Sequence, residues 1–459
     1  MNIALVNPPW IHLSNASAVR AGSRWPHIRH NYFHIFPFPY RLAEATSSLI
    51  RAGHNAILVD SLAEGLTIEQ TLHRCKGCSF FIVETATNSL PYDIKFLKSI
   101  KAIFPEVIIA CVGQHAAVGE NDLTPFCNFV LPYEYDQKVL NIANGFPPGD
   151  DIVDINHIPW PFRDPKLILS YQEGFCTHFP NATVTISRGC PYACSFCQEP
   201  TVYYNKSGRR IRNPIDVVDE WQYLISHFNL KELYIDDATF NADEDYLNAI
   251  LDEYERRNMR IFLSAMGDAR ISNKLLERLS RNGFTGLKIG VESIHPHILK
   301  GINKSWLKIN DIERVVTKCR ELNIFIHGTF ILGLPGDNVD TIRQTIDYAL
   351  KTNFSFIQFS PFIPLPGTKI YDEIRKLNWR FETNTDNNIF ISRPELSATE
   401  LCKLYKYAQS RINKRVFSSL YLIKKYLLLS LFLKDWHTIL LMIVNRFASI
   451  LKYSSRDRS

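Results

Sequence analysis

Three cysteines in one short segment are the residues best suited to chemistry: Cys190, Cys194 and Cys197. At this C-x3-C-x2-C spacing their thiolates can wrap a loop around one face of an iron–sulfur cube. Three thiolates can hold only three of the four irons, so the fourth iron stays open to a ligand. A zinc site, which usually takes four ligands, and inert buried thiols are the alternatives. The other close pair, Cys75 and Cys78, lies far upstream, so the spacing favours a [4Fe-4S] cluster.

The segment that carries these cysteines, residues 187–197, resembles the signature of the radical S-adenosylmethionine (SAM) enzymes. In that family the open iron binds SAM, and one electron from the cluster splits SAM into methionine and a 5′-deoxyadenosyl radical. The resemblance implies that the aromatic ring of Phe196 lies near the adenine. It also implies a one-electron donor such as a flavodoxin or a ferredoxin.

Later segments resemble the SAM-binding motifs of the same family. Residues 233–240 resemble an I-x-D-D-x-F run, residues 288–293 a G-V-E-S motif, and residues 364–368 a P-x-P-G-T motif. The resemblance implies SAM contacts from Phe196, Asp236, Asp237, Gly290, Glu292, Ser293, Ile331 and Gly333. Helix capping by the aspartates and a surface salt bridge from the glutamate are the alternatives.

The first part of the chain resembles a cobalamin-binding domain that is fused to one branch of this family, in residues 6–10 and 112–117. The resemblance implies cobalamin contacts from Asn7, Thr85, Gly113, Gln114, His115 and Glu134. Two features depart from the pattern. The D-x-H-x-x-G run that often holds cobalt is missing, and residues 132–136 replace a G-E-G-E run, which could crowd the nucleotide tail. A cobalamin-binding domain and a retained scaffold without the cofactor both stay open.

The preferred interpretation is cobalamin-dependent methyl transfer to an unactivated carbon of a small, hydrophobic substrate. Radical cyclisation, rearrangement or dehydration with a relic cobalamin domain is the first alternative, and a non-catalytic iron–sulfur binding or sensing protein is the second. Three basic side chains could meet an acidic group of the substrate or the SAM carboxylate: Arg188, Arg270 and Lys304.

The elements that must position these residues follow two strand–helix alternations. Residues 1–145 predict a doubly wound parallel sheet, because their apolar strands alternate with helices. Its strands are expected at 3–7, 56–60, 79–83, 107–112 and 128–131. A linker is expected at 146–182. Residues 183–365 predict a partial (β/α)6 barrel, with function at the carboxyl ends of its strands. Those strands are expected at 183–187, 232–236, 261–265, 286–290, 324–332 and 356–362. A helical region is expected at 366–459.

Composition sets outer limits. The chain is 46% hydrophobic and 21% charged, a globular profile, and its net charge of +6 does not argue for a nucleic-acid partner. The N-terminus predicts no secretory signal, and ten cysteines with a cluster motif favour a reducing cytoplasm. Residues 416–453 are apolar with interspersed basic residues, which predicts either membrane-surface contact or packing on the barrel. We expect His27, His30 and His34 to line a pocket or the surface rather than bind a metal.

Overall fold

The computed structural model describes residues 1–10, 36–149, 154–377, 379–383 and 389–417, two short strands, β2 (Ala18–Val19) and β3 (His27–Ile28), and residue 432. The predictions for the side chains of His27, His30 and His34, and for nearly all of residues 416–453, lie outside this description.

The N-terminal domain is a five-stranded parallel sheet in the order β4-β1-β5-β6-β7. Its strands are β1 (Asn2–Asn7), β4 (Asn55–Asp60), β5 (Phe80–Glu84), β6 (Ile108–Val112) and β7 (Phe129–Val130). Four main helices join them: α1 (Tyr40–Arg51), α2 (Ile68–Arg74), α3 (Leu90–Ile103) and α5 (Asp136–Ala143). The strand order reverses at β1, and folds of this type bind ligands in the crevice at the carboxyl ends of their strands.

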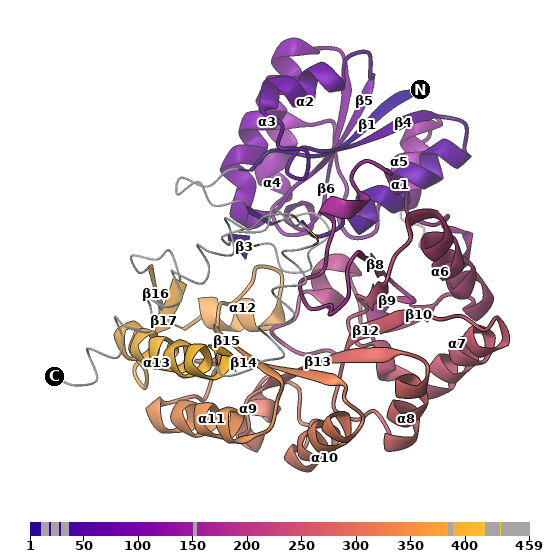
Figure 1. Ribbon diagram of the computed structural model, residues 1–459. Helices are drawn as coiled ribbons and strands as arrows, with labels where there is room; N and C mark the ends of the chain where they lie inside the picture. The colour runs from indigo at the N-terminus through magenta and orange to yellow at the C-terminus, as the bar shows by residue number, and fades with distance from the viewer. Residues whose placement is uncertain are drawn as a thin grey trace.

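Both faces of this sheet are buried, as its unalternating apolar strands predict. In β1, Ile3 and Leu5 pack with α1 and α5 on one face, and Ala4 and Val6 pack with α2 and α3 on the other. Figure 1 shows these helix pairs on opposite sides of the sheet. The predicted doubly wound fold is therefore confirmed.

The second domain is an open, six-stranded parallel sheet in the order β15-β14-β13-β12-β11-β8. Its strands are β8 (Asn181–Val184), β11 (Glu232–Ile235), β12 (Phe262–Gly267), β13 (Phe284–Glu292), β14 (Phe325–Leu332) and β15 (Phe356–Pro361). Between them run α6 (Pro214–Phe228), α7 (Glu244–Arg256), α8 (Asn273–Arg281), α9 (Pro296–Gly301), α10 (Ile309–Glu321) and α11 (Val339–Lys351). The strands follow one another in chain order, so the predicted partial (β/α)6 barrel is confirmed.

The open edge of the barrel at β15 is covered by the last long helix, α13 (Ala398–Phe417) (Figure 1). The side chain of Gln409 on α13 donates to the Phe359 carbonyl of β15 at 3.2 Å. Covering an exposed edge strand in this way removes a site of unwanted pairing. In the described part of the chain, no helix is both long and apolar enough to cross a membrane.

Two elements near the cysteines were not predicted. The strand expected at 183–187 ends at Val184, and Ser187–Cys190 forms a separate strand, β9, antiparallel to β10 (Gly208–Ile211). A π-helix, Glu199–Tyr203, follows the cysteines. Short irregular helices of this kind are frequent at functional sites.

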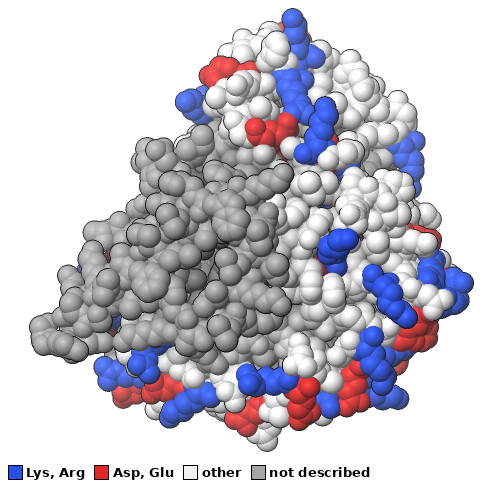
Figure 2. All heavy atoms as spheres, in the orientation of Figure 1, with Lys and Arg blue, Asp and Glu red and all other residues white. Residues whose placement is uncertain are grey.

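The outer faces of the barrel helices carry charges of both signs side by side, as Figure 2 shows along the lower edge of the molecule. Arg278 pairs with Asp252 and Glu255, and Arg257 pairs with Glu253. Exposed pairs of this kind contribute little to stability. Buried charges occur both within the barrel domain and between the two domains.

Candidate active site between the two domains

The cysteine loop is anchored at both of its ends. Cys190 ends strand β9, where Gly189 adopts φ +85° and lies so close to β10 that a Cβ atom would come within 2.3 Å of the Gly208 carbonyl oxygen. On the other side, the amide of Ser195 donates to the carbonyl of Ile302 at 3.0 Å, and the Asn303 side chain donates to the Ala193 carbonyl at 2.7 Å. The loop is therefore held between the β9–β10 hairpin and the segment after α9.

Burial makes two of the cysteines, Cys194 and Cys197, reluctant to ionise without a metal. Burial raises the pKa of Cys194 to about 11, although the ammonium of Lys304 opposes this effect. Burial also raises the pKa of Cys197, to which the carboxylate of Glu199 adds. The Cys194 and Cys197 thiols interact with each other and with Cys190, which shows that the three lie near one another.

The donor set fits a cube better than a single ion. Among the described residues, no three His, Cys, Asp or Glu side chains converge closely enough to hold one metal ion. A structural zinc needs such convergence, whereas in a cube each thiolate binds its own iron.

A buried ion pair lies beside the cysteines at the carboxyl end of β13. Glu292 follows an irregularity in the pairing of β13 with β14 and adopts φ +62°. Its Oε1 accepts a hydrogen bond from Nζ of Lys304 at 2.8 Å, and the same ammonium donates to the Gly290 carbonyl at 2.9 Å. Burial alone would lower the pKa of Lys304, but Glu292 and the Cys194 thiol raise it. Lys304 therefore links Gly290, Glu292 and Cys194 at one place beside the cysteine loop.

The two aspartates after β11 lie differently. The carboxylate of Asp237 is buried and accepts hydrogen bonds from the Ile186 amide, at 2.8 Å, and from the Ser187 hydroxyl. Asp237 thus fixes the start of the strand that leads to Cys190. Asp236 is half-buried and lines the pocket described below.

The remaining residues predicted to contact SAM are partly engaged in packing. Phe196 and Ile331 are half-buried against the barrel core. Ser293 is buried, and its hydroxyl accepts from the His295 amide at 3.3 Å. Gly333 has φ +91°, and its backbone lies against Leu401 of α13, so its immediate neighbour is a helix.

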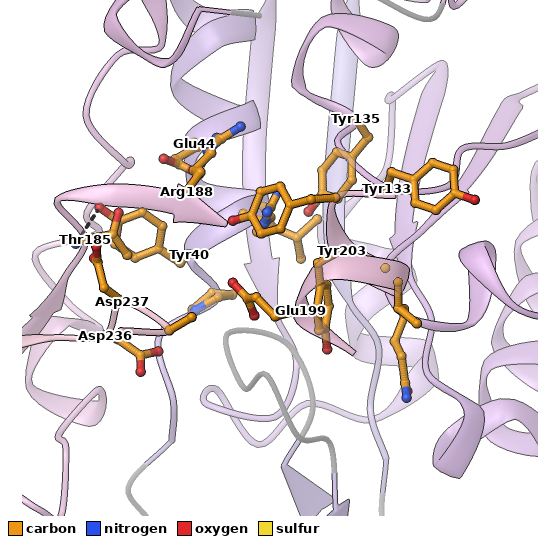
Figure 3. Close-up of a pocket in the computed structure, with 18 of the residues that line it drawn as sticks. Tyr40, Glu44, Tyr133, Tyr135, Thr185, Arg188, Glu199, Tyr203, Asp236 and Asp237 are labelled. Atoms are coloured by element: carbon orange, nitrogen blue, oxygen red, sulfur yellow. Dashed lines mark hydrogen bonds and ion pairs between the residues drawn. The ribbon is translucent and has the colours of Figure 1, made fainter. Parts of the chain in front are cut away.

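A pocket lies where the carboxyl edges of the two sheets face each other (Figure 3). Its empty space is about 950 Å³, including solvent at the mouth. The N-terminal domain contributes Tyr40, Arg41, Glu84, Gly113, Gln114, Tyr133 and Tyr135, and the barrel domain contributes Arg188, Glu199, Tyr203, Tyr204, Asp236 and Asp237. A concave site with aromatic walls and a few converging polar groups is typical of small-molecule binding.

The residues predicted to contact cobalamin divide into two groups. Gly113 and Gln114 line the pocket, and the Gln114 amide donates to the Gln198 side chain of the other domain at 3.0 Å. The other four use their side chains within the protein. The Asn7 side chain donates to Asp60 at 2.8 Å, and the Thr85 hydroxyl donates to the Val112 carbonyl at 2.8 Å. The His115 ring contacts Thr87 at 3.1 Å and Asp122 at 3.2 Å. The Glu134 carboxylate accepts a hydrogen bond from Arg188 at 2.8 Å.

A buried ionic cluster joins the domains at the back of this pocket. The guanidinium of Arg188 donates to Glu44 at 2.7 Å, to Glu134 at 2.8 Å and to Asp136 at 2.8 Å. Arg188 belongs to the barrel domain and lies two residues before Cys190, whereas its three partners belong to the N-terminal domain. The position of the cysteine loop is thereby tied to that of the N-terminal sheet.

Several pocket residues escaped the sequence-based predictions. Tyr40 and Arg41 lie at the start of α1, and nothing in the sequence alone assigns them to a pocket wall. Glu199, Tyr203 and Tyr204 follow the third cysteine closely. The sequence feature that could have indicated these pocket residues is the group of acidic and aromatic residues directly after Cys197.

Comparisons with known proteins agree with this geometry. Residues 184–349 match the radical SAM superfamily. An uncharacterized methyltransferase of Pyrococcus horikoshii is 26% identical over 431 residues, which cover 84% of this chain and 88% of that protein. The anaerobic magnesium-protoporphyrin IX monomethyl ester cyclase of Cereibacter sphaeroides is 21% identical over 82% of this chain and 64% of that protein.

A solved structure covers nearly the whole chain. The radical SAM methyltransferase TsrM from Kitasatospora setae, determined with cobalamin and a [4Fe-4S] cluster bound, superimposes with a TM-score of 0.69. Its sequence is 14% identical, and the match covers 95% of this chain and 99% of that one. At this identity the likeness establishes the fold. Residues 184–349 therefore form a radical SAM domain, and the chain has the two-domain fold of TsrM.

Proposed function

We propose that the protein is a cobalamin-dependent radical SAM methyltransferase that acts on an unactivated carbon of a small molecule. The observation that carries the proposal is the pocket whose walls come from both domains, with Gly113 and Gln114 on one side and Asp236 on the other. Such a pocket brings a cofactor on the N-terminal sheet to the SAM side of the barrel. The methyltransferase relatives support the same reaction class.

The protein's residues have separate tasks in this proposal. Cys190, Cys194 and Cys197 hold the cluster, and Gly290, Glu292 and Asp236 lie where SAM would bind. Phe196, Asp237, Ser293, Ile331 and Gly333 complete the proposed SAM surroundings. The reduced cluster supplies the electron that cleaves SAM to methionine and a 5′-deoxyadenosyl radical, and cobalamin supplies the methyl group. No other side chain is assigned to the chemistry.

The walls of the pocket fit a corrinoid. Gly113 has φ +93°, and a Cβ atom there would lie 2.4 Å from the Glu84 carboxylate, so a side chain at this position would displace Glu84, which also lines the pocket. The rings of Tyr40, Tyr133 and Tyr203 offer flat apolar surfaces to a macrocycle. We propose Asn7, Thr85, His115 and Glu134 as residues that support the cofactor site from behind this surface.

One observation favours a second function. The loop at 132–136 places Tyr133, at φ +63°, and the buried Tyr135 in the pocket, where the glycines of the usual motif would leave room for a nucleotide tail. The similarity to an anaerobic cyclase is compatible with a radical reaction that transfers no methyl group. Radical cyclisation, rearrangement or dehydration in a relic cobalamin domain is therefore the alternative.

Further parts of the proposal concern the protein's surroundings. The cluster needs a one-electron donor of the flavodoxin or ferredoxin class and a reducing compartment such as the cytoplasm. We propose that the cobalamin-binding-like domain spans residues 1–145, the linker 146–182, the barrel 183–365 and the C-terminal region 366–459. We also propose that the substrate is hydrophobic and that residues 416–453 contact a membrane surface.

Visible absorption of the purified protein with added hydroxocobalamin tests the proposal against its alternative. A methyltransferase of this class retains the corrinoid through gel filtration at one per chain. A protein that cleaves SAM after cluster reconstitution but retains no corrinoid supports the alternative and contradicts methyl transfer from cobalamin.

A further inference from the structure

Arg41 is a buried cation with an unused hydrogen-bond donor in the wall of the interdomain pocket. It lies in the first turn of α1, and its guanidinium packs over the ring of Tyr204, 4.7 Å from the ring centre. Its Nη1 atom is buried and has no hydrogen-bond partner among the described residues. A buried, unpaired charged donor costs more than an unpaired neutral one, so it requires an explanation.

The neighbouring carboxylates do not provide that partner. Glu134, Glu44 and Asp136 all accept hydrogen bonds from Arg188, and Glu134 also accepts from Arg210. Glu134 and Asp136 interact with Arg41 only through space. Their field holds the guanidinium in its charged form, while its Nη1 still points to no acceptor in the protein.

The charge of the pocket limits what that acceptor can be. Three carboxylates and three guanidinium groups, including Arg41, balance one another at the back of the pocket. Glu84, Glu199 and Asp236 also line the pocket, so a ligand with several negative charges would be repelled. The charge of the pocket is compatible with an acceptor oxygen that carries one negative charge or none. A planar guanidinium is well suited to donate to phosphate or amide oxygens.

We infer that Arg41 is a ligand-binding residue whose Nη1 donates to an oxygen of the bound corrinoid. This inference rests on the proposed function. Two groups of the corrinoid have the required chemistry, the phosphodiester of the nucleotide tail and the amides at the rim of the macrocycle.

Titrations followed by visible absorption distinguish the two groups. Hydroxocobalamin carries both, whereas cobinamide lacks the phosphodiester and the nucleotide. We expect Arg41→Met to weaken hydroxocobalamin binding at least about tenfold, or about 1.4 kcal/mol, because it removes a charge-assisted hydrogen bond. If the tail phosphodiester is the acceptor, cobinamide binding is unchanged. If a rim amide is the acceptor, both ligands weaken together. Arg41→Lys, which keeps the charge but not the planar fork, should restore binding only in part.

Two controls keep the test specific. Arg51 lies at an exposed position in the last turn of the same helix. The Arg51→Met protein should therefore bind both corrinoids as the parent does. Thermal unfolding of the corrinoid-free protein gives a second readout. Because Arg41 helps to balance the buried carboxylates, Arg41→Met should melt below the parent, whereas Arg41→Lys, which keeps the charge, should melt near the parent's temperature and still bind hydroxocobalamin more weakly.

The outcomes separate this inference from the proposed function. A parent protein that binds neither corrinoid overturns both. A parent that binds hydroxocobalamin, with Arg41→Met binding equally well, overturns the inference alone. An Arg41→Lys variant that melts as the parent does and binds hydroxocobalamin equally well also overturns it, because the planar guanidinium would then not be needed by the ligand.

Discussion

The pair formed by Glu292 and Lys304 shows how single residues shape the site. Both residues are buried, with exposed fractions of 6% each, and their side chains meet at 2.8 Å beside Cys194. A buried pair seldom adds net stability, because desolvation offsets the attraction. The Lys304 ammonium does, however, favour the thiolate form of Cys194, which is the form that binds iron.

Removing one partner should therefore be costly. Lys304→Met leaves the Glu292 carboxylate buried without its cation, and we expect a loss of about 3–5 kcal/mol in the free energy of unfolding. Urea denaturation of the corrinoid-free protein at pH 7 measures this loss. The double variant Glu292→Gln with Lys304→Met should lose less than Lys304→Met alone, since no charge stays unpaired. Equal stability of Lys304→Met and the parent would contradict this account.

Individual residues differ in how well the sequence predicts them. The positions of Cys190, Cys194 and Glu292 follow from local motifs, because each motif lies at the end of one strand. The partners of Arg188 do not, because Glu44, Glu134 and Asp136 lie far from it in the chain and meet it only after the domains dock.

Among the elements, the β9–β10 hairpin has the most direct influence on the cluster. It carries Cys190, and its tight approach depends on Gly189 having no side chain. The strands of both sheets were predictable to within a few residues, because buried parallel strands are short apolar runs. The end of β8 at Val184 was not predictable from the sequence, because the next residues leave the sheet to form β9. Strand β9 depends on pairing with Gly208–Ile211, which no local sequence pattern identifies as its partner.

Gly189→Ala tests the role of the hairpin. The new Cβ would collide with the Gly208 carbonyl, and the positive φ is strained for alanine, so we expect a loss of at least about 1–3 kcal/mol in stability. We also expect less iron and labile sulfide per chain after anaerobic reconstitution. Gly301→Ala is the matched control, because nothing lies within 4 Å of its Cβ position. Iron loading of Gly189→Ala equal to that of the control would refute this role.

For the whole molecule, the ionic cluster around Arg188 couples the two domains and should make the free energy of unfolding depend on pH. Burial alone would raise the pKa of Glu134, but Arg188, Arg41 and Arg210 together lower it. A carboxyl whose pKa is lowered on folding stabilises the protein above its ordinary pKa of about 4.3 and loses this contribution as the pH falls. Glu44, whose pKa burial raises, acts in the opposite direction.

The free energy of unfolding should consequently fall between about pH 5 and pH 3 in the parent protein. Glu134→Gln should show a shallower decline over the same range, because its amide does not titrate. Tryptophan fluorescence in urea at several pH values measures both curves. Parallel curves would show that the Glu134 carboxylate contributes nothing to this dependence.

The central claim is that three cysteines hold a cluster that cleaves SAM. The most direct measurement is 5′-deoxyadenosine formed after anaerobic reconstitution with iron and sulfide and reduction in the presence of SAM. The account predicts that the parent forms 5′-deoxyadenosine and that Cys194→Ala forms none. Formation of 5′-deoxyadenosine at the same rate by Cys194→Ala, or none by a parent with a full complement of iron and sulfide, would contradict it.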